Sequence, residues 1–168
     1  MNSQQSAAPE QLAPVAKSVT VPVTVSEAFE VFTRRPSEWW PAGHVLVGGR
    51  REAVVFEPFT GGRWFERAEG GAERDWGRVV SWDPPRSLVL TWRIDARWQP
   101  IDDDERASEI AVFFEPADTH STRVELVHRA LDRHGPGGAA IRAAIDGPSP
   151  GETLSVYRDL ILADALRR

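Results

Sequence analysis

Hydrophobic and polar residues alternate through much of the middle of the chain, which indicates β-strands. Between residues 88 and 94 every second residue is large and apolar, so one face of this segment is apolar. A second apolar run, 79–82, precedes it, and a turn with two prolines separates the two runs. Because proline cannot donate to a sheet ladder, the prolines lie between strands, and the segment predicts an antiparallel hairpin.

Similar patterns recur before and after this hairpin, and glycine or proline separates most of them. Residues 19–25, in which valine occupies alternate positions, indicate a first strand, and Pro22 favours a sheet edge or a bulge. The short gaps between successive strands favour an antiparallel meander over parallel crossovers. Further strands are expected at residues 53–57, 63–68, 76–82, 87–95, 109–115 and 122–129.

Helical spacing of apolar residues is confined to a few segments. Ser26 is expected to cap a short helix whose buried side is supplied by residues 28–32, and Pro36 to end it. Apolar residues recur at helical spacing through 151–166, which predicts a long amphipathic helix at the end of the chain. Shorter helices are expected at residues 37–41 and 137–146.

Together these elements predict one α+β domain. The sheet needs a cover for its apolar face, and the C-terminal helix is the only predicted element long enough to supply it. We therefore expect a curved antiparallel sheet wrapped around that helix, with two short helices after the first strand. Such a sheet leaves an internal gap, which is the usual origin of a ligand cavity. Residues 1–15 are expected to form a disordered lead, and residues 16–168 the domain.

Composition restricts the environment and the partners of the protein. The 168 residues carry a net charge of -5, which makes nucleic acid an unfavourable partner, and include no cysteine, which excludes disulfides and thiolate chemistry. No apolar stretch approaches the roughly 18 residues that span a bilayer, and no signal peptide is recognisable. We expect a cytoplasmic protein with no membrane insertion, present as a monomer or a homodimer.

Four parts of the chain, taken in order, resemble a known family. They are the strand and helix of residues 19–32, the cluster Trp-Trp-Pro at 39–41, the run Phe-Thr-Gly-Gly-Arg-Trp at 59–64, and the hairpin formed by Gly-Arg-Val at 77–79 with residues 83–92. The chain resembles the START-like (SRPBCC) superfamily. Within it, the chain is similar to the family related to the activator of the heat-shock protein 90 ATPase.

This resemblance covers residues 17–166 and implies the helix-grip fold that is shared with birch-pollen-type allergens. It also implies a cavity for a hydrophobic ligand and, through the family name, a chaperone partner and a role in the stress response. One departure concerns the start of the last helix. Family members usually carry Gly-Trp there, whereas this chain has Gly151-Glu152.

Seven tryptophans provide the candidates for a ligand-binding wall. Each indole buries a large area, so these side chains either form the core or line a cavity for an aromatic ligand. Trp64, Trp76 and Trp92 lie inside predicted strands and are the cavity candidates. Phe56 and Tyr157 are expected to join them.

Two polar residues complete the predicted ligand site. His128 follows Val124 and Leu126 at strand spacing, so its side chain is expected to point inward. There it is either a satisfied histidine at the rim or a polar group that orients a ligand or acts as acid or base. Arg78 lies in mid-strand and either faces solvent or meets an acidic ligand.

Recognisable catalytic and metal motifs are absent from the sequence. The acidic run 102–105 lacks the glycine and the spaced ligands of a calcium loop. The four histidines lack the spacing of a zinc enzyme, and there is no nucleophile elbow, phosphate loop or dinucleotide fingerprint. We expect no cofactor, no metal and no clear catalytic centre.

Three functions stay open at this point. The first is the binding of a hydrophobic or aromatic small molecule in an internal cavity, without catalysis. The second is a co-chaperone-like module that binds another protein. The third is a cyclase- or hydrolase-like enzyme that acts on an aromatic or polyketide-type substrate, with His128 or Tyr157 as the group to test.

Overall fold

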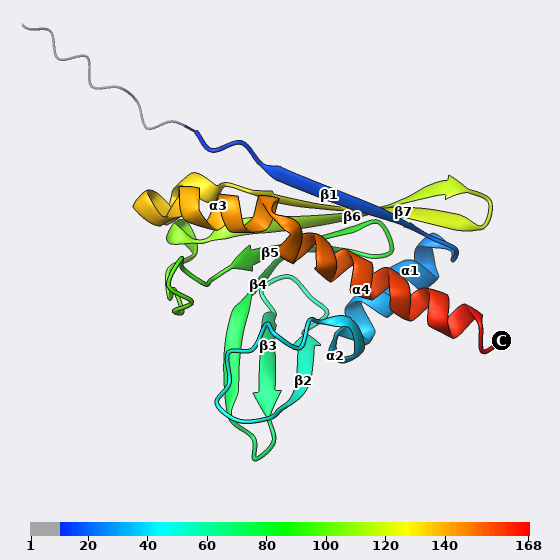
Figure 1. Ribbon diagram of the computed structural model, residues 1–168, viewed down its shortest axis with the longest axis horizontal. Helices are drawn as coiled ribbons and strands as arrows, with labels where there is room; N and C mark the ends of the chain where they lie inside the picture. The colour runs from blue at the N-terminus through cyan, green and yellow to red at the C-terminus, as the bar shows by residue number, and fades with distance from the viewer. Residues whose placement is uncertain (1–10) are drawn as a thin grey trace, which may run out of the picture.

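The computed structural model describes residues 11–168, with the side chains of all of these except residues 148–152. Seven strands form one antiparallel sheet in the order β1-β7-β6-β5-β4-β3-β2 (Figure 1). Successive strands pair from β2 to β7, and β1 closes the sheet by pairing with β7. The strands are β1 (Val15–Val21), β2 (Arg51–Phe56), β3 (Arg63–Ala68), β4 (Glu73–Asp83), β5 (Ser87–Trp92), β6 (Ser108–Asp118) and β7 (Ser121–Arg129).

One long helix crosses this sheet, and shorter helices flank it (Figure 1). The long helix α4 buries Leu154, Tyr157 and Ile161 in the main core. The Tyr157 hydroxyl donates to the carbonyl of Ala28 at 2.7 Å, which ties α4 to α1. The helices are α1 (Val25–Arg34), α2 (Pro36–Trp39), α3 (Gly138–Asp146) and α4 (Pro148–Ala165), with the 3₁₀ helices η1 (Asp104–Arg106) and η2 (Leu131–Gly137).

The predicted helix-grip architecture is confirmed, whereas several local details differ. The cap of α1 is Thr24, not Ser26, because the Thr24 hydroxyl accepts from the backbone of Glu27 at 3.3 Å. The first strand ends at Val21, one residue before Pro22, so the proline follows the edge strand. The short helix η2 was not expected, since it has no apolar periodicity.

The described chain starts before the predicted domain boundary. Val15 opens β1 opposite His128. Leu12 packs with Val15, Leu131 and Ile141 in a second small core. Residues 1–10 of the predicted lead lie outside the described residues.

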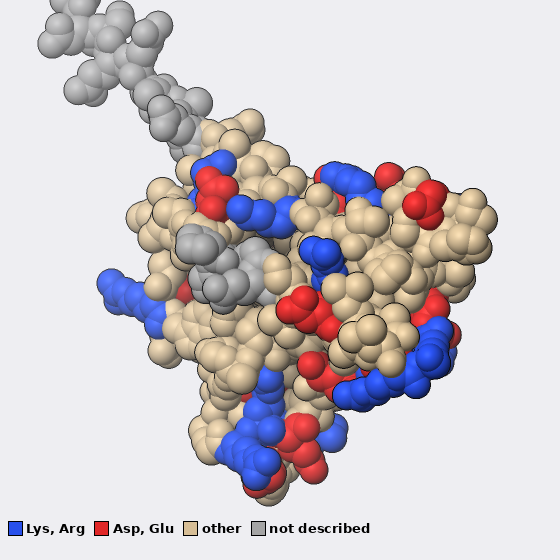
Figure 2. All heavy atoms as spheres, turned by 45° about the vertical axis from the view of Figure 1, so that its right-hand side comes forward, with Lys and Arg blue, Asp and Glu red and all other residues tan. Residues whose placement is uncertain are grey.

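The surface carries charges of both signs. On the face shown in Figure 2, acidic and basic side chains are interspersed. Arg35, for example, is held between Glu38 and Asp164, each 2.5 Å away, so it joins α2 to α4. Among the described residues, no helix is long and apolar enough to span a membrane.

The sheet bends sharply in the region of β4. Strands β2 and β3 are turned well away from the direction of β1, β6 and β7 (Figure 1). Register shifts accompany this bend on both sides of β4, between Trp64 and Phe65 in β3 and between Val79 and Ser81 in β4. Such irregularities increase local twist and redirect a strand. The bend therefore gives the sheet a concave side on which side chains converge.

A close backbone contact accompanies the bend. A Cβ atom on Gly77 would lie 1.8 Å from the carbonyl oxygen of Thr91, which is far inside van der Waals contact. The neighbouring hydroxyl of Thr91 accepts from the backbone of Arg78 at 2.8 Å. Only glycine fits at this position unless β4 and β5 move apart.

We expect Gly77→Ala to lower the free energy of unfolding by about 3 kcal/mol, because the new methyl group must displace β5. Urea denaturation with constant slope measures this change. Gly43→Ala is the matched control, since nothing lies within 4 Å of its Cβ position. Equal stability of the two variants would contradict the steric account of the bend.

Candidate functional site

Indole rings from three neighbouring strands form one wall on the concave side of the sheet. The centroids of Trp64 and Trp76 are 6.0 Å apart, and those of Trp76 and Trp92 are 5.4 Å apart. Trp40, which follows α2, meets Trp64 and Trp76 edge to face at 5.3 and 5.2 Å. Contacts of this kind stabilise aromatic pairs beyond the area that they bury. The result is a continuous aromatic surface beneath α2 and α4.

A small cavity lies against this surface. Its volume is about 80 Å³. The lining combines aliphatic residues with two tryptophans and two histidines. These residues are Val15, Lys17, Trp40, His44, Trp92, Ile110, Leu126, His128, Ile145, Thr153 and Leu154.

His128 belongs to a buried polar cluster next to the cavity. Its Nε2 lies 2.6 Å from the hydroxyl oxygen of Ser108, and Nε2 of His134 lies 2.7 Å from the same oxygen. The backbone N–H of Ser108 also donates to Nε2 of His134 at 3.2 Å. Ser108 is fully buried and His128 is 3% exposed. Two imidazoles and one hydroxyl thus meet where water is largely excluded.

Three different elements bring this cluster together. Ser108 is the first residue of β6 and lies opposite Trp92 of β5. His128 of β7 pairs with Ile110 of β6, so it lies on the same side of the sheet two residues further along. His134 comes from η2, which turns back over the end of the sheet directly after β7.

The environment keeps both histidines of the cluster uncharged at neutral pH. Burial lowers the pKa of His128 to about 3, and repulsion from His134 adds to the effect. Burial also lowers the pKa of His134, and the negative charge of Asp95 opposes that shift. A neutral imidazole can accept a proton from a ligand, which an imidazolium cannot.

The structure separates the predicted site residues into two groups. Trp92 and His128 line the cavity. Phe56, Trp64, Trp76 and Tyr157 belong to the packed main core, although Trp64 and Trp76 support the cavity through Trp40. Whether any of these residues binds a ligand stays a prediction.

The other two polar candidates differ in their surroundings. Arg78 is half-buried and lies opposite Arg63 in the register of β3 and β4. It is not among the residues that line the cavity. Burial raises the pKa of the Tyr157 hydroxyl, which already donates to Ala28. Tyr157 is therefore engaged in holding two helices together.

Sequence reasoning missed several residues of the site. Ser108 and His134 are 26 positions apart, and no local pattern links them. In the sequence, Trp40 stands out only as part of a tryptophan cluster, and His44 only as one of four histidines without the spacing of a metal site. Thr153 was hidden within the periodicity of the last helix. The sequence contains one signal for Ser108, a polar residue at strand spacing from Ile110 and Val112.

The side chain of Arg51 anchors the segment that carries Trp40 and His44. The Arg51 guanidinium donates to the carbonyls of Trp40, Pro41 and His44 at 3.1, 3.3 and 2.7 Å. Burial lowers the pKa of Arg51, and the fully buried Glu66 opposes this shift. No group of three or more potential metal ligands occurs within the described part of the chain.

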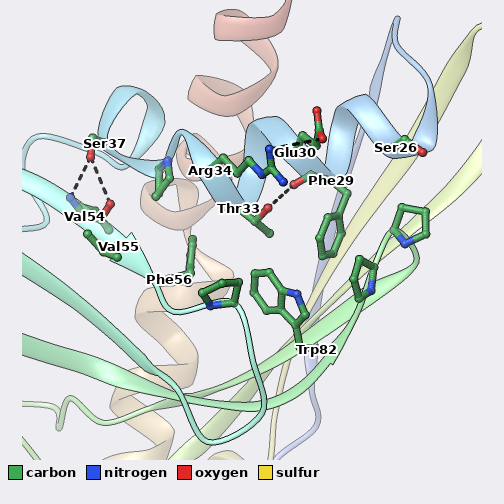
Figure 3. A pocket seen from close by; sticks show the side chains of 14 residues that line it. Ser26, Phe29, Glu30, Thr33, Arg34, Ser37, Val54, Val55, Phe56 and Trp82 are labelled. Atoms are coloured by element: carbon green, nitrogen blue, oxygen red, sulfur yellow. Dashed lines mark hydrogen bonds and ion pairs between the residues drawn. The ribbon is translucent and has the colours of Figure 1, made fainter.

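A larger hollow lies on the other side of α1 (Figure 3). Its volume is about 630 Å³, and Phe29, Trp82 and several prolines contribute to its walls. Phe29 and Trp82 meet edge to face with centroids 5.4 Å apart. Its charged groups, Glu30 and Arg34, form an exposed pair at 3.8 Å. This groove can accept apolar groups, but it contains no buried acid or base.

Comparisons with known proteins agree with this architecture. Residues 22–143 match the model of the family described as activator of Hsp90 ATPase homolog 1-like protein. No curated protein matches the chain. An Aha1 dimer from Colwellia psychrerythraea has 14% sequence identity and a TM-score of 0.58, over 89% of this chain and 96% of that one. At this identity the likeness concerns the fold alone.

Two solved structures are more similar in sequence. One is described as an anthrahydroquino-γ-pyrone synthase, Txn09, complexed with SUM. It is 53% identical, with a TM-score of 0.62, over 90% of this chain and 99% of that one. The other is described as a self-sacrificing resistance protein, CalC from Micromonospora echinospora. It is 32% identical, with a TM-score of 0.65, over 90% of this chain and 95% of that one.

The buried neutral His128 predicts a specific loss of stability in acid. Its pKa is lowered from 6.5 to about 3 in the folded protein, so the unfolded chain binds an extra proton between these values, and acid favours unfolding. From pH 7 to pH 5 this one group should lower the free energy of unfolding by about 2 kcal/mol. Urea denaturation measures this change. Between pH 7 and pH 5, we expect the free energy of unfolding of His128→Gln to fall by about 2 kcal/mol less than that of the wild type.

The exposed His120 provides the control for this measurement. His120→Gln should behave like the wild type, because that side chain is in solvent in both states. Identical pH dependence in the wild type and in His128→Gln would contradict the burial of a neutral His128.

Proposed function

The chain belongs to the family of activator of Hsp90 ATPase homolog 1-like proteins, and from this premise we propose that it is an enzyme that closes a ring on an aromatic polyketide-type substrate. The ring formed is a γ-pyrone, and the substrate is an anthrahydroquinone that carries a carbonyl side chain. The tryptophan-lined cavity binds the aromatic nucleus, and His128 faces the reacting atoms.

The proposal is carried by one combined observation: the chain is similar in sequence to a synthase, and it also has a proton acceptor in an aromatic cavity. The 53% identity to a synthase of this kind extends over 90% of the chain. In the same chain, a neutral histidine with a hydrogen-bonded partner lines a cavity between aromatic side chains. A flat aromatic ligand suits stacking against indole rings, and ring closure through a phenol requires a proton acceptor.

The reaction needs only proton transfers once the substrate is held in place. The phenolic oxygen attacks a side-chain carbonyl carbon, a C–O bond forms, and His128 accepts the phenolic proton. His128 returns that proton to the former carbonyl oxygen, whose π bond has broken, and this gives a hemiketal. His128 then takes a proton from the adjacent CH2 carbon and delivers it to the hydroxyl group, which leaves as water while a C=C bond forms. The histidine ends as it began, and no oxidant or cofactor is consumed. Holding the two reacting groups together supplies much of the acceleration.

Spare hydrogen-bond donors near the cavity suit the oxygens of such a substrate. Nε1 of Trp64 and Nε1 of Trp76 are buried and have no hydrogen-bond partner among the described residues. Both indoles lie directly behind Trp40. A quinone-type oxygen that reached them would satisfy a buried N–H group, which is costly to leave unpaired.

The cavity must widen before such a substrate can bind. Its volume of about 80 Å³ is well below the roughly 300–1,000 Å³ of typical ligand pockets. Trp40 and His44 form part of its wall and lie in the segment between α2 and β2 that has no regular structure. Arg51 holds this segment through its backbone carbonyls, so the segment can move without unpairing a strand.

The groove outside α1 is larger but suits the proposed reaction less well. Its volume of about 630 Å³ would accept the substrate without rearrangement. The groups available there are an exposed ion pair, hydroxyls and prolines. Proton transfer in water-exposed surroundings gains little from the protein, so we assign the chemistry to the internal cavity.

Binding without turnover is the second candidate function. The 32% identity to a self-sacrificing resistance protein favours a chain that captures a small molecule without turnover. The same cavity would serve this function, and the measurement of turnover decides between the two. A co-chaperone function has weaker support, because the Aha1 likeness at 14% identity concerns the fold alone.

For catalysis, we expect His128→Gln to reduce kcat by about 10²–10⁴-fold, because the proton acceptor is lost. The assay follows the absorbance of an anthrahydroquinone with a 1,3-diketone side chain as the pyrone forms. The control is His120→Gln, which should retain wild-type kcat. Full activity in His128→Gln would refute the assignment, and no turnover by the wild type would favour binding alone.

For binding, we expect Trp92→Ala to raise the Kd for 1,8-dihydroxyanthraquinone at least tenfold, about 1.4 kcal/mol, through lost stacking. Isothermal titration measures the Kd. Trp82→Ala is the matched control, because its indole lies in the outer groove and should leave the Kd unchanged. The reverse ranking of these two variants would place the ligand in the groove instead.

A further inference from the structure

The contacts of Ser108 determine where the protons of two histidines lie. One hydroxyl has a single proton to donate, yet the oxygen of Ser108 is within hydrogen-bond distance of both His128 and His134. It therefore donates to one imidazole and accepts from the other. The direction of this chain of hydrogen bonds follows from a third contact.

That third contact comes from the backbone. The N–H of Ser108 donates to Nε2 of His134 at 3.2 Å, so this nitrogen carries a lone pair and no proton. The hydroxyl of Ser108, 2.7 Å from the same nitrogen, must then donate to it as well. Consequently Nε2 of His128 carries a proton and donates to the Ser108 oxygen at 2.6 Å. The tautomers are inferred from this network.

This arrangement leaves Nδ1 of His128 as a proton acceptor. In a neutral imidazole only one nitrogen is protonated, and here it is Nε2. No described residue makes a hydrogen bond to Nδ1 of His128, whose ring lines the cavity. A substrate hydroxyl in the cavity can therefore meet the unprotonated nitrogen of a correctly oriented ring.

We propose that Ser108 and His134 are positioning residues of a proton relay, through which a proton accepted by His128 from the substrate passes out of the cavity and later returns. This inference rests on the proposed ring closure. It assigns roles to two residues that do not themselves touch the substrate. His128 alone is the group in contact with the reacting atoms.

Each step of the relay conserves protons. The substrate phenol gives its proton to Nδ1 of His128, while the proton on Nε2 moves to the oxygen of Ser108. The hydroxyl proton of Ser108 moves to Nε2 of His134, which becomes an imidazolium. When the proton returns to the former carbonyl oxygen and gives the hemiketal, the same three transfers run backwards. A second cycle of transfers moves a proton from the adjacent carbon to the hydroxyl group that leaves as water. Each residue then recovers its starting tautomer.

The charges around the cluster explain why the proton should move outward. His128 is 3% exposed, and Lys17 of β1 and His44 of the segment after α2 line the same cavity. The polar residue that α4 contributes to the lining is Thr153, which carries no charge. A positive charge on His128 would therefore be desolvated and would have no negative partner among these groups. His134 is only half-buried and feels the negative charge of Asp95. The outer imidazole is the better place for the charge.

The backbone that presents His134 is held in an unusual conformation. Ala130 has a φ of 55°, in the left-handed region that residues with a Cβ rarely adopt. The next residue, Leu131, is fully buried and anchors the turn in the second small core. Strained residues of this kind persist when the surrounding structure over-determines them. The turn that directs His134 toward Ser108 is therefore well fixed.

Nuclear magnetic resonance of the ligand-free protein tests the relay geometry without any reaction. With ¹⁵N-labelled histidine, long-range ¹⁵N–¹H correlation spectra report which ring nitrogen carries the proton. We expect His128 as the Nε2–H tautomer and His134 as the Nδ1–H tautomer at pH 7. His120→Gln and His44→Gln identify the remaining signals. The opposite pair of tautomers, or a charged His128, would overturn the proposal.

Kinetics test whether the relay operates. Ser108→Ala interrupts it, and we expect kcat to fall at least tenfold while KM stays within twofold, because Ser108 does not touch the substrate. Ser108→Thr keeps a hydroxyl and should recover most of the lost rate, whereas His134→Phe should resemble Ser108→Ala. Unchanged kcat in both Ser108→Ala and His134→Phe would overturn the relay, even if His128→Gln is inactive.

The two proposals fail in different ways. If the wild type closes no ring, the proposed function fails, and the tautomers still decide whether the hydrogen-bond chain has the inferred direction. If Ser108→Thr does not fold, the comparison of Ser108→Ala with the wild type and the spectra of the wild type remain decisive. An active enzyme with the wrong tautomers would retain the proposed function and reject the relay.

Discussion

The bend of the sheet at β4 is the constraint on which the rest of the structure depends. It requires β5 to approach the backbone of Gly77 so closely that a side chain there would overlap the carbonyl of Thr91. The register shifts on both sides of β4 belong to the same bend. Because β2 and β3 turn away from the remaining strands, the indoles of Trp64, Trp76 and Trp92 converge instead of lying on one flat face. A flat sheet would offer a surface for a helix, but no cavity between helix and sheet.

Within this concave frame, the protein buries polar groups that a purely structural core would avoid. A buried hydroxyl or imidazole costs free energy unless it is hydrogen-bonded. Ser108, His128 and His134 hydrogen-bond one another through the serine hydroxyl and the two Nε2 atoms, whereas Nδ1 of His134 is buried without a partner among the described residues. The same burial keeps His128 uncharged at neutral pH. The arrangement is therefore consistent with a group that accepts a proton, and it imposes a dependence of stability on pH.

Little space for a ligand remains on the concave side of the sheet. Aromatic contacts fill most of the concave side, and the remaining space of about 80 Å³ is too small for a polycyclic substrate. Trp40 and His44 form part of the cavity wall and belong to a segment whose backbone carbonyls accept hydrogen bonds from Arg51. An enzyme with this geometry would bind its substrate by displacing part of its own aromatic core, which would exclude water from the reacting groups.

The sequence by itself determined the architecture and the family. Alternating residues, paired prolines in turns and the periodicity of the last helix are local signals, and each predicts an element without knowledge of the others. Strand parity also brought Trp92 and His128 to the concave side, since side chains alternate across a strand. It could not place Arg78 or distinguish Trp92 from Trp64, because register shifts change which face a residue occupies.

Only the tertiary structure decided what surrounds each of these side chains. The folding of β6, β7 and the turn after β7 onto one another brings together Ser108, His128 and His134. The spacing of these residues along the chain does not predict that contact. The left-handed conformation at Ala130 that directs His134 inward has no signature such as glycine. A hydrogen-bonded cluster depends on distances between elements, and these are set by how the sheet bends and how the helices pack. The sequence thus determined the scaffold, whereas packing decided the chemistry that the scaffold can support.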